Sequence, residues 1–262
     1  MEFTGLAAPL SPTGLQSVAT TLGVDLATVW AVATVETRSC GFFANRKPQI
    51  LFERHVFHRL TNGAFDAQRP DLSNPTPGGY SDPSSDQYVR LQQAIALDES
   101  AALRSASWGI GQVMGFNAAK AGFADAAAMV AAFLQGEDAQ FQAAAQFIVA
   151  SGLASKLANQ DWAGYALGYN GANYKQNAYD DKLKLAHARF SVGPLPDLHT
   201  RAVQLALMLV GKLAANGIDG LFGNMTQQAL LSFQGDAGLS QTGRPDDATV
   251  AALVGKLGWG QV

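Results

Sequence analysis

The spacing of hydrophobic residues predicts that the chain begins with two helices. Four apolar residues recur at the positions of one helix face, namely Leu15, Val18, Ala19 and Leu22. Ser11-Pro12 precedes this face and Gly23 follows it, which is typical of a capped first turn and of a glycine that ends a helix. Asp25 then suits the cap of a second helix, so the pattern indicates two helices joined by a short turn.

The second helix carries a carboxyl group on its apolar side. That side is formed by Leu26, Val29, Trp30 and Ala33. Glu36 continues it, and both burial and the negative end of the helix dipole raise the pKa of a carboxyl placed there. A carboxylic acid that stays protonated near neutral pH is what a glycosidase needs to protonate a leaving oxygen. Position alone leaves open a structural ion pair of Glu36 with Arg38 or Arg54.

Helical periodicity continues to about residue 190, with two interruptions. We predict a short strand followed by a helix over 49–60, and helices or helical turns near 86–95, 100–103, 125–134, 138–150, 161–167 and 179–190. Residues 61–86 are rich in proline, glycine and serine and indicate a long loop of the kind that is often functional. The glycine-rich segment 107–115 indicates a turn or short strand that approaches another group closely. The fold class is therefore all-α, with at most a short β element.

A break in the pattern divides the chain into two parts. Residues 191–196 contain two prolines and a glycine without alternating apolar positions, which is typical of a linker. We expect a first domain over 1–190, a linker over 191–199 and a small three-helix domain over 200–262. A helical unit of that size is only marginally stable by itself.

Composition and charge exclude several classes of partner and cofactor. The net charge of −3 is unsuited to a nucleic acid or another polyphosphate. The single cysteine, Cys40, excludes an internal disulfide, and we expect a buried thiol and not a nucleophile. His55 and His58 have the spacing of two zinc ligands on one helix, but no third ligand stands out. We therefore expect no metal and no cofactor.

The N-terminal residues and the length of the apolar segments predict where the protein is found in the cell. Residues 1–5 lack the basic and apolar regions of a secretory signal. No uninterrupted apolar stretch approaches the roughly 20 residues that span a bilayer. We expect synthesis in the cytoplasm and no stable membrane binding.

The last sixty residues resemble the small helical peptidoglycan-binding domain of many cell-wall enzymes. The resemblance is carried by Val203-Gln204-Leu205, Asp219-Gly220-Leu221-Phe222-Gly223, Thr226, Phe233-Gln234 and Thr242-Gly243. Asp219-Gly220 suits a tight turn between helices, and Thr226 suits the cap of the second helix. The resemblance implies a module that holds an enzyme on murein and performs no chemistry.

Residues 14–190 resemble the N-acetylmuramidase family of phage endolysins, within the lysozyme-like superfamily. Three blocks carry this resemblance, namely Val35-Glu36-Thr37-Arg38, Ile50-Leu51-Phe52-Glu53-Arg54-His55 and Ser105-Ala106-Ser107-Trp108-Gly109-Ile110-Gly111-Gln112. A shorter pattern that also includes Tyr169-Asn170-Gly171 is similar to lytic transglycosylases and goose-type lysozymes. The likeness implies a lysozyme-like α+β catalytic domain with Glu36 as the acid. It also implies that the glycine-rich turn and Tyr169-Asn170 line the groove.

The second carboxylate is less well defined by the sequence. Glu53, Asp98 and Glu99 are candidates, and we favour Glu53 because it lies in a family block and follows an apolar triplet. A pairing of Glu53 with Arg54 or Arg38 is the structural alternative. Without an opposed carboxylate the muramoyl 6-hydroxyl would attack, and the enzyme would be a lytic transglycosylase.

The predicted site contains two catalytic and four substrate-binding residues. Glu36 and Glu53 are the catalytic pair, and the sugar groove is lined by Ser107, Gln112, Tyr169 and Asn170. Trp108 is expected in the core instead.

These features predict a two-module endolysin. It would hydrolyse the β-1,4 bond between N-acetylmuramic acid and N-acetylglucosamine and lyse the host. A transglycosylase and a catalytically inactive wall-binding phage protein are the alternatives. We expect a monomer that reaches the periplasmic peptidoglycan after a holin permeabilises the membrane. We also expect residues 1–190 alone to retain lytic activity with weaker substrate binding.

Overall fold

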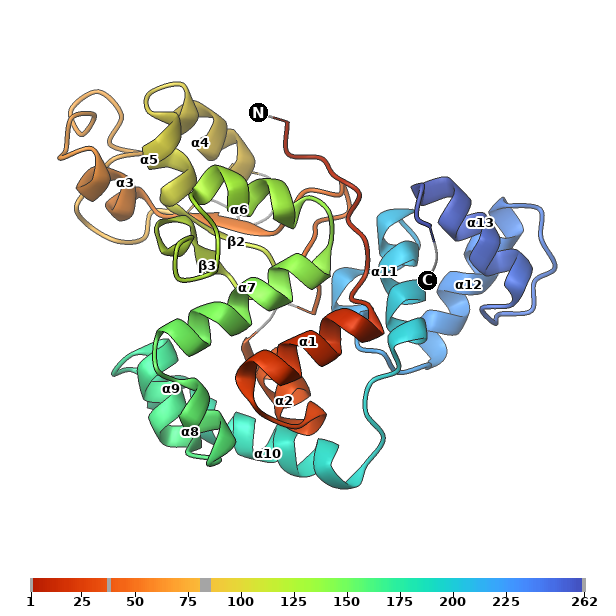
Figure 1. Cartoon of the computed structure of the whole chain (residues 1–262). Coiled ribbons are helices and arrows are strands. Elements are labelled where there is room, and N and C mark those ends of the chain that lie inside the picture. Colours follow the sequence, from red (N-terminus) through yellow and green to blue (C-terminus); the bar gives the residue numbers. More distant parts are fainter. Residues whose placement is uncertain (1, 37–38, 81–85, 261–262) are drawn as a thin grey trace.

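The computed structural model describes residues 2–36, 39–80 and 86–260 and is mainly helical (Figure 1). The first part of the chain contains the helices α1 (Pro12–Leu22), α2 (Leu26–Glu36), α3 (Arg54–Leu60), α4 (Asp86–Ile95), α5 (Glu99–Arg104), α6 (Ala126–Phe133), α7 (Glu137–Ala150), α8 (Ala154–Ala158), α9 (Trp162–Asn170) and α10 (Tyr179–Val192). Single 3-10 turns occur at η1 (Gly115–Asn117) and η2 (Tyr174–Asn177). The last part contains α11 (Leu198–Leu209), η3 (Ala215–Gly217), α12 (Asn224–Asp236) and α13 (Asp247–Leu257). The predicted fold class is confirmed.

The first two helices begin and end as their sequence predicts. The hydroxyl of Ser11 accepts a hydrogen bond from the Gly14 amide at 2.9 Å, with Pro12 as the first helical residue of α1. Gly23 ends α1 in the left-handed region, at φ 67°. The carboxylate of Asp25 accepts from the Thr28 amide at 2.8 Å and caps α2.

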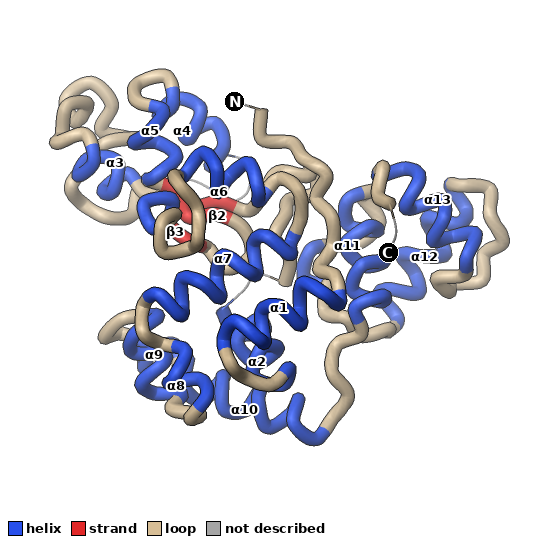
Figure 2. The backbone as a smooth tube through the Cα atoms, viewed as in Figure 1, coloured by secondary structure: helices blue, strands red, loops and turns tan. Residues whose placement is uncertain are grey.

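The short β element is a three-stranded antiparallel sheet (Figure 2). Its strands are β1 (Ile50–Phe52), β2 (Ala106–Trp108) and β3 (Val113–Met114), in that order. Leu51 pairs with Ser107, and residues 109–112 form the turn between β2 and β3. The indole of Trp108 is fully buried, which confirms its predicted place in the core.

Helix α7 separates two hydrophobic cores. One core lies between α1, α2, α9 and α10, and it receives Phe141 and Ile148 from α7. The other core lies among the sheet and α4 to α6, and it receives Ala143 from the other side of α7. Figure 1 shows α7 running between these two groups of elements. Both hydrophobic cores therefore pack against α7, one on each side of the helix.

Two predicted local features are wrong. Helix α9 does not break at Gly168 but continues to Asn170. A Cβ atom at position 168 would lie 2.4 Å from Leu153 Cδ2, so this glycine serves close packing between helices and not a turn. Thr226 is not the cap of α12, because Gly223 holds that position and the Thr226 hydroxyl accepts from Gln204 Nε2 at 3.0 Å.

Buried glutamines organise the three C-terminal helices. The side chain of Gln204 on α11 donates to Asp219 and Leu221 and accepts from the amide of Gly220, which fixes the turn before α12. Gln234 on α12 makes equivalent bonds to the segment before α13, donating to Thr242, Arg244 and Thr249 and accepting from Gly243. The shared pattern explains why α11 and α12 each bury a glutamine side chain.

Cys40 and the helices α1 and α2 belong to the packed interior of the protein. The thiol of Cys40 is fully buried, and burial raises its pKa to about 11, so it is not a reactive nucleophile. In the described part of the chain, no single helix has both the length and the apolar character of a membrane span. Among the described helices, α1 and α2 taken together have that length and apolar character, but their axes meet at a bend of 98°.

Candidate active site

Glu36 is the last residue of α2 and its carboxyl is half-buried. Burial raises the pKa of this carboxyl, and a hydrogen bond from Asn170 Nδ2 to Oε1, 2.9 Å long, lowers it by a smaller amount. Among the described residues, no salt bridge involves Glu36. The Arg54 guanidinium donates to the Thr76 carbonyl instead, and Arg38 and Thr37 lie outside the described residues. Burial therefore raises the pKa of this carboxyl, which is the direction that the sequence pattern predicts.

The end of α9 faces the glycine-rich turn. Tyr169 Oη donates to the Gly111 carbonyl at 3.3 Å, and its ring stacks on Tyr165 with the centroids 5.4 Å apart. Phe147 meets the same ring edge-on from α7. Because Asn170 follows Tyr169 directly, these contacts fix the amide that donates to Glu36.

The turn between β2 and β3 is held by its own side chains. Gln112 has a φ of 47°, in a region that residues other than glycine rarely adopt. Its Nε2 donates to the Gly109 carbonyl at 2.8 Å, and its Oε1 accepts from the Ser107 hydroxyl at 2.9 Å. Ser107 and Gln112 thus bond to each other and stabilise the turn that contacts Tyr169. Strain of this kind is typical of functional sites.

Glu53 lies at the start of α3, directly after β1. Its side chain is 15% exposed, and both carboxylate oxygens accept from Tyr80 Oη, at 2.7 and 2.9 Å. His55 Nδ1 lies 3.1 Å from Oε2. Burial and the Glu53 carboxylate raise the pKa of Tyr80 to about 12, so the phenol keeps its proton and acts as a donor. The alternative pairing of Glu53 with Arg54 is not observed.

The other two candidate carboxylates have different surroundings. Asp98 caps α5 by accepting from the Ala101 amide at 2.8 Å, and both Asp98 and Glu99 are exposed. Glu53, in contrast, is attached to the sheet, because its amide donates to the Ser105 carbonyl at 2.9 Å. The β2–β3 hairpin therefore joins the Glu53 side of the site to the Tyr169 and Asn170 side.

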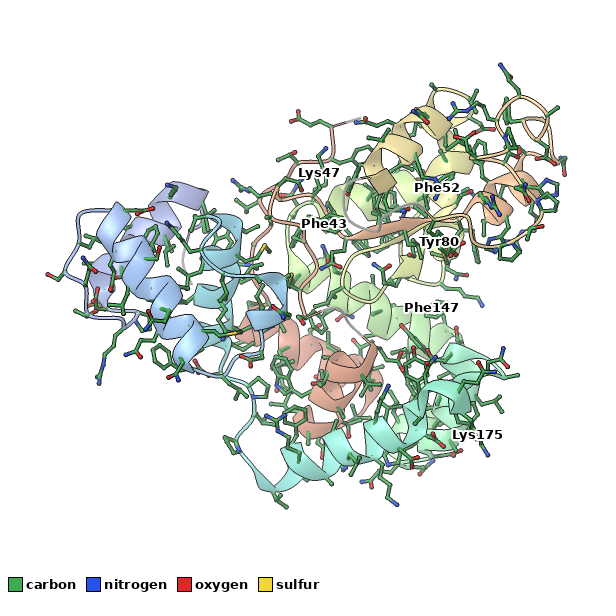
Figure 3. All side chains as sticks on the ribbon, turned by 180° about the vertical axis from the view of Figure 1, so that it is seen from behind. Phe43, Lys47, Phe52, Tyr80, Phe147 and Lys175 are labelled. Carbon is green, nitrogen blue, oxygen red and sulfur yellow. The ribbon has the colours of Figure 1, made fainter. Side chains whose placement is uncertain are left out.

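The sequence did not point to Tyr80, His55 or Gln140 as members of this site. Tyr80 comes from the loop that follows α3, whose composition did indicate a functional loop. Figure 3 shows Tyr80 beside the sheet and Phe147 on α7, on the same face of the molecule. Gln140 on α7 is fully buried and accepts from the Ile110 amide at 2.8 Å, so it supports the turn from behind.

The two histidines of α3 have separate partners. His55 lies beside Glu53, whereas His58 Nδ1 lies 2.8 Å from Asp66 Oδ2. Within residues 2–36, 39–80 and 86–260, no group of three or more His, Cys, Asp and Glu side chains is arranged to hold a metal ion. Each imidazole therefore lies beside one carboxylate, and that of His58 is hydrogen-bonded to Asp66.

A half-buried carboxyl with a raised pKa, placed at a helix end beside a glycine-rich turn and a small sheet, is the arrangement expected of a lysozyme-like glycosidase. The sequence matches the N-acetylmuramidase family over residues 25–191, and the chain belongs to this family. Residues 199–253 match a peptidoglycan binding domain. The protein is therefore a peptidoglycan glycoside hydrolase with a wall-binding module.

Comparison with solved structures agrees with this assignment. The crystal structure of the Burkholderia AP3 phage endolysin matches with 38% sequence identity and a TM-score of 0.65. The match covers 68% of this chain and 69% of the AP3 chain. A search of curated proteins gives no match. The protein is a homologue of a phage endolysin, and its target is the host cell wall.

Proposed function

We propose that this endolysin hydrolyses the β-1,4 bond between N-acetylmuramic acid and N-acetylglucosamine, with Glu36 as the general acid. The observation that carries the proposal is the half-buried Glu36 carboxyl, whose pKa is raised by burial and which accepts a hydrogen bond from Asn170. A protonated Glu36 donates its proton to the glycosidic oxygen as the bond breaks. The Asn170 amide then stabilises the carboxylate that remains.

Glu53 is proposed as the second carboxylate. The Tyr80 hydroxyl donates to the Glu53 carboxylate beside the β2–β3 hairpin, and His55 Nδ1 lies 3.1 Å from Oε2. A fixed negative charge there stabilises the oxocarbenium-like transition state or activates a water molecule. Ser107 and Gln112 shape the turn, and Tyr169 and Asn170 complete the proposed sugar-binding surface.

A lytic transglycosylase is the second candidate, and one observation favours it. The single Tyr80 hydroxyl lies within hydrogen-bond distance of both Glu53 oxygens, and a hydrogen bond to this carboxylate lowers its strength as a nucleophile. In that reaction the muramoyl 6-hydroxyl attacks the anomeric carbon, the glycosidic oxygen leaves with the proton of Glu36, and a 1,6-anhydro end forms.

Mass spectrometry of digested, borohydride-reduced murein distinguishes the reactions. Our proposal predicts that the new reducing ends are muramic acid, which reduction converts to muramitol. Products that are lighter by one water and resist reduction would show a transglycosylase. New reducing ends of N-acetylglucosamine would show that the other bond is cut.

The domain boundaries and the setting in the host are also part of this proposal. We assign catalysis to residues 1–190, a linker to 191–199 and wall binding to 200–262. The irregular segment between α10 and α11 spans residues 193–197. The monomeric enzyme reaches the periplasmic peptidoglycan after a holin opens the membrane and thereby lyses the host. Expression without a holin should then leave the producing cells intact.

A further inference from the structure

The C-terminal helices place a charged residue inside the catalytic part of the protein. Arg201 on α11 is 3% exposed, and Glu137, the first residue of α7, is fully buried. Arg201 Nη2 lies 2.9 Å from Glu137 Oε1, and Nη1 bonds to Oε2. A two-pronged ion pair without access to water is costly to desolvate unless its geometry and remaining hydrogen bonds are satisfied.

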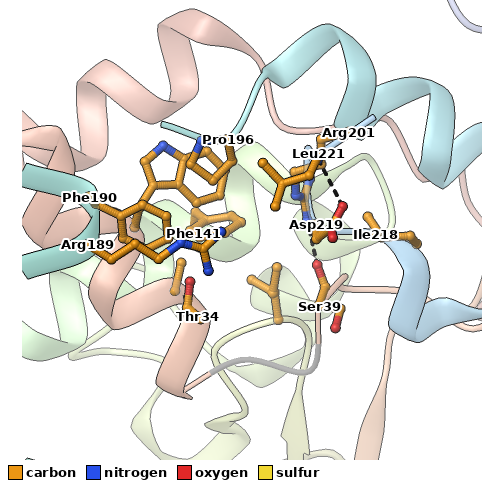
Figure 4. Close-up of a pocket in the computed structure, with 13 residues that line it drawn as sticks. Thr34, Ser39, Phe141, Arg189, Phe190, Pro196, Arg201, Ile218, Asp219 and Leu221 are labelled. Atoms are coloured by element: carbon orange, nitrogen blue, oxygen red, sulfur yellow. Dashed lines mark hydrogen bonds between the residues drawn. The ribbon is translucent and has the colours of Figure 1, made fainter. Parts of the chain in front are cut away.

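The remaining hydrogen bonds of this pair go to the segment that follows the acid. Arg201 Nη2 also donates to the Ser39 carbonyl at 2.9 Å (Figure 4). Glu137 Oε1 accepts from the Gly41 amide at 2.9 Å, and Oε2 accepts from the Leu10 amide at 3.1 Å. Ser39 is only three residues after Glu36, so its anchor limits where the end of α2 can lie.

The same end of α7 supports the glycine-rich turn. Gln140, one turn after Glu137, accepts from the Ile110 amide and donates to the Phe133 carbonyl. Its side chain fills the space beside two glycines, because a Cβ at Gly41 would lie 1.8 Å from its Oε1 and one at Gly109 would lie 2.8 Å from it. The two sides of the site, the end of α2 and the Gly109–Gln112 turn, thus rest on one helix end.

Further contacts join the two units around this ion pair. Trp259, after α13, donates from its indole nitrogen to the Leu6 carbonyl at 2.9 Å. Cys40 packs in the hydrophobic core formed by the C-terminal helices. A cavity of about 150 Å³ beside the pair is lined by both units, including Thr34 and Asp219 (Figure 4).

From these contacts we infer that Arg201 is a positioning residue for the active site, supplied by the peptidoglycan-binding unit. Its guanidinium neutralises Glu137 and fixes Ser39, and through them it holds the chain that follows the proposed acid. This role rests on the proposed function of Glu36. It also bears on the expectation that residues 1–190 alone retain lytic activity with weaker substrate binding: we now expect their kcat to fall as well, because those residues contain Glu137 without its partner.

The test compares the full-length protein with its Arg201→Met variant. The substrate is a soluble, uncrosslinked murein hexasaccharide, so the measured rate does not depend on binding to the insoluble wall. We expect kcat to fall about tenfold or more, as for a misplaced catalytic group, with KM changed by less than about threefold. The alkaline limb of the kcat profile should also move, because the surroundings of Glu36 change. Binding to insoluble murein should persist. Native kcat and an unmoved limb in the folded variant would overturn the inference.

Two further variants keep the test decisive. Lys212→Met removes an exposed ion pair with Asp236 in the same unit and should leave kcat and its pH profile unchanged. If Arg201→Met does not fold, Glu137→Gln combined with Arg201→Met removes the unpaired buried charge, and replacing both partners is often tolerated. Low kcat with a moved limb in the double variant supports the inference, and native behaviour overturns it.

The inference and the proposed function fail in different ways. If Glu36→Gln hydrolyses the hexasaccharide at the native rate, Glu36 is not the acid, whatever Arg201→Met does. If Glu36→Gln is inactive and Arg201→Met is native in kcat and pH profile, only the positioning role is wrong.

Discussion

At the scale of single residues, the proposed chemistry depends on the Glu36 carboxyl and its amide partner Asn170. Burial raises the pKa of Glu36, and Asn170 opposes that effect with a 2.9 Å hydrogen bond. The stripe of apolar residues on α2 was enough to predict a carboxyl on the inner side of the helix at position 36, whereas its role as the acid came from the family resemblance. The Asn170 contact joins residues 134 positions apart, so only the family resemblance pointed to it.

Replacing Asn170 with alanine should shift the pH dependence in a defined direction. The lost hydrogen bond stabilises the carboxylate, so its removal raises the pKa of Glu36 further. The acid form then persists to higher pH, and the alkaline limb of kcat moves upward. Rates on a soluble murein oligosaccharide across pH measure this shift, and a limb that moves to lower pH would contradict the assignment of Asn170.

Replacing Tyr80 with phenylalanine tests the support of Glu53. The change removes both hydrogen bonds to the carboxylate and keeps the ring. Bonds to a charged group contribute about 1.5–3 kcal/mol when buried, and Tyr80 is partly exposed, so we expect kcat to fall only about tenfold. Steady-state kinetics provide the measurement. An unchanged kcat would show that Glu53 needs no such support, and a rise would indicate that Tyr80 restrains a nucleophile.

At the scale of secondary structure, the sequence predicted a helix end correctly where a capping residue sets it. The prediction was wrong where packing against another element sets it. Ser11 and Asp25 accept hydrogen bonds from amides three residues further on, and Gly23 turns the chain by its own backbone angles. Because these interactions are local, the sequence predicts the helix ends that they form. The helix over 161–167 was predicted to end before Gly168, yet α9 continues to Asn170 and Gly168 packs against the side chain of Leu153, the residue before α8. A glycine that serves a turn and one that serves packing look alike until the neighbouring element is known.

Gln234 offers a test of how buried amides hold the C-terminal helices. Its side chain donates to Thr242, Arg244 and Thr249 and accepts from Gly243. Gln234→Ala leaves these groups unpaired and should lower the free energy of unfolding by about 2–3 kcal/mol. Gln228→Ala, on the exposed side of α12, is the matched control and should change it by less than about 0.5 kcal/mol. Urea titrations measure both, and equal effects would refute this role.

At the scale of the whole molecule, the sequence predicted the two parts but not how they meet. Periodicity and composition indicated a mainly helical first part and a small helical last part. The Arg201–Glu137 pair and the Trp259–Leu6 bond span 64 and 253 positions, and no local pattern indicates such contacts. The one available signal was Arg201 on the mostly apolar helix α11, since a buried arginine requires a partner.

The shared interface predicts that the two parts unfold together. A buried ion pair and a common core around Cys40 couple their stabilities. Calorimetry of the full chain should show one transition, whereas weakly joined domains unfold separately. Arg201→Met should lower the transition temperature of the whole protein. Two well-separated transitions in the native chain would contradict this coupling.

The most direct test of the central claim is the rate at which Glu36→Gln digests purified murein. The glutamine keeps the size and the hydrogen-bonding capacity of the side chain but has no proton to give. We predict a rate at least about 100-fold below that of the native enzyme, since general acids contribute roughly 10²–10⁴-fold. Asp181→Asn, which neutralises an exposed carboxylate on α10, should keep the native rate. A Glu36→Gln variant that digests murein within a few-fold of the native rate would contradict the claim.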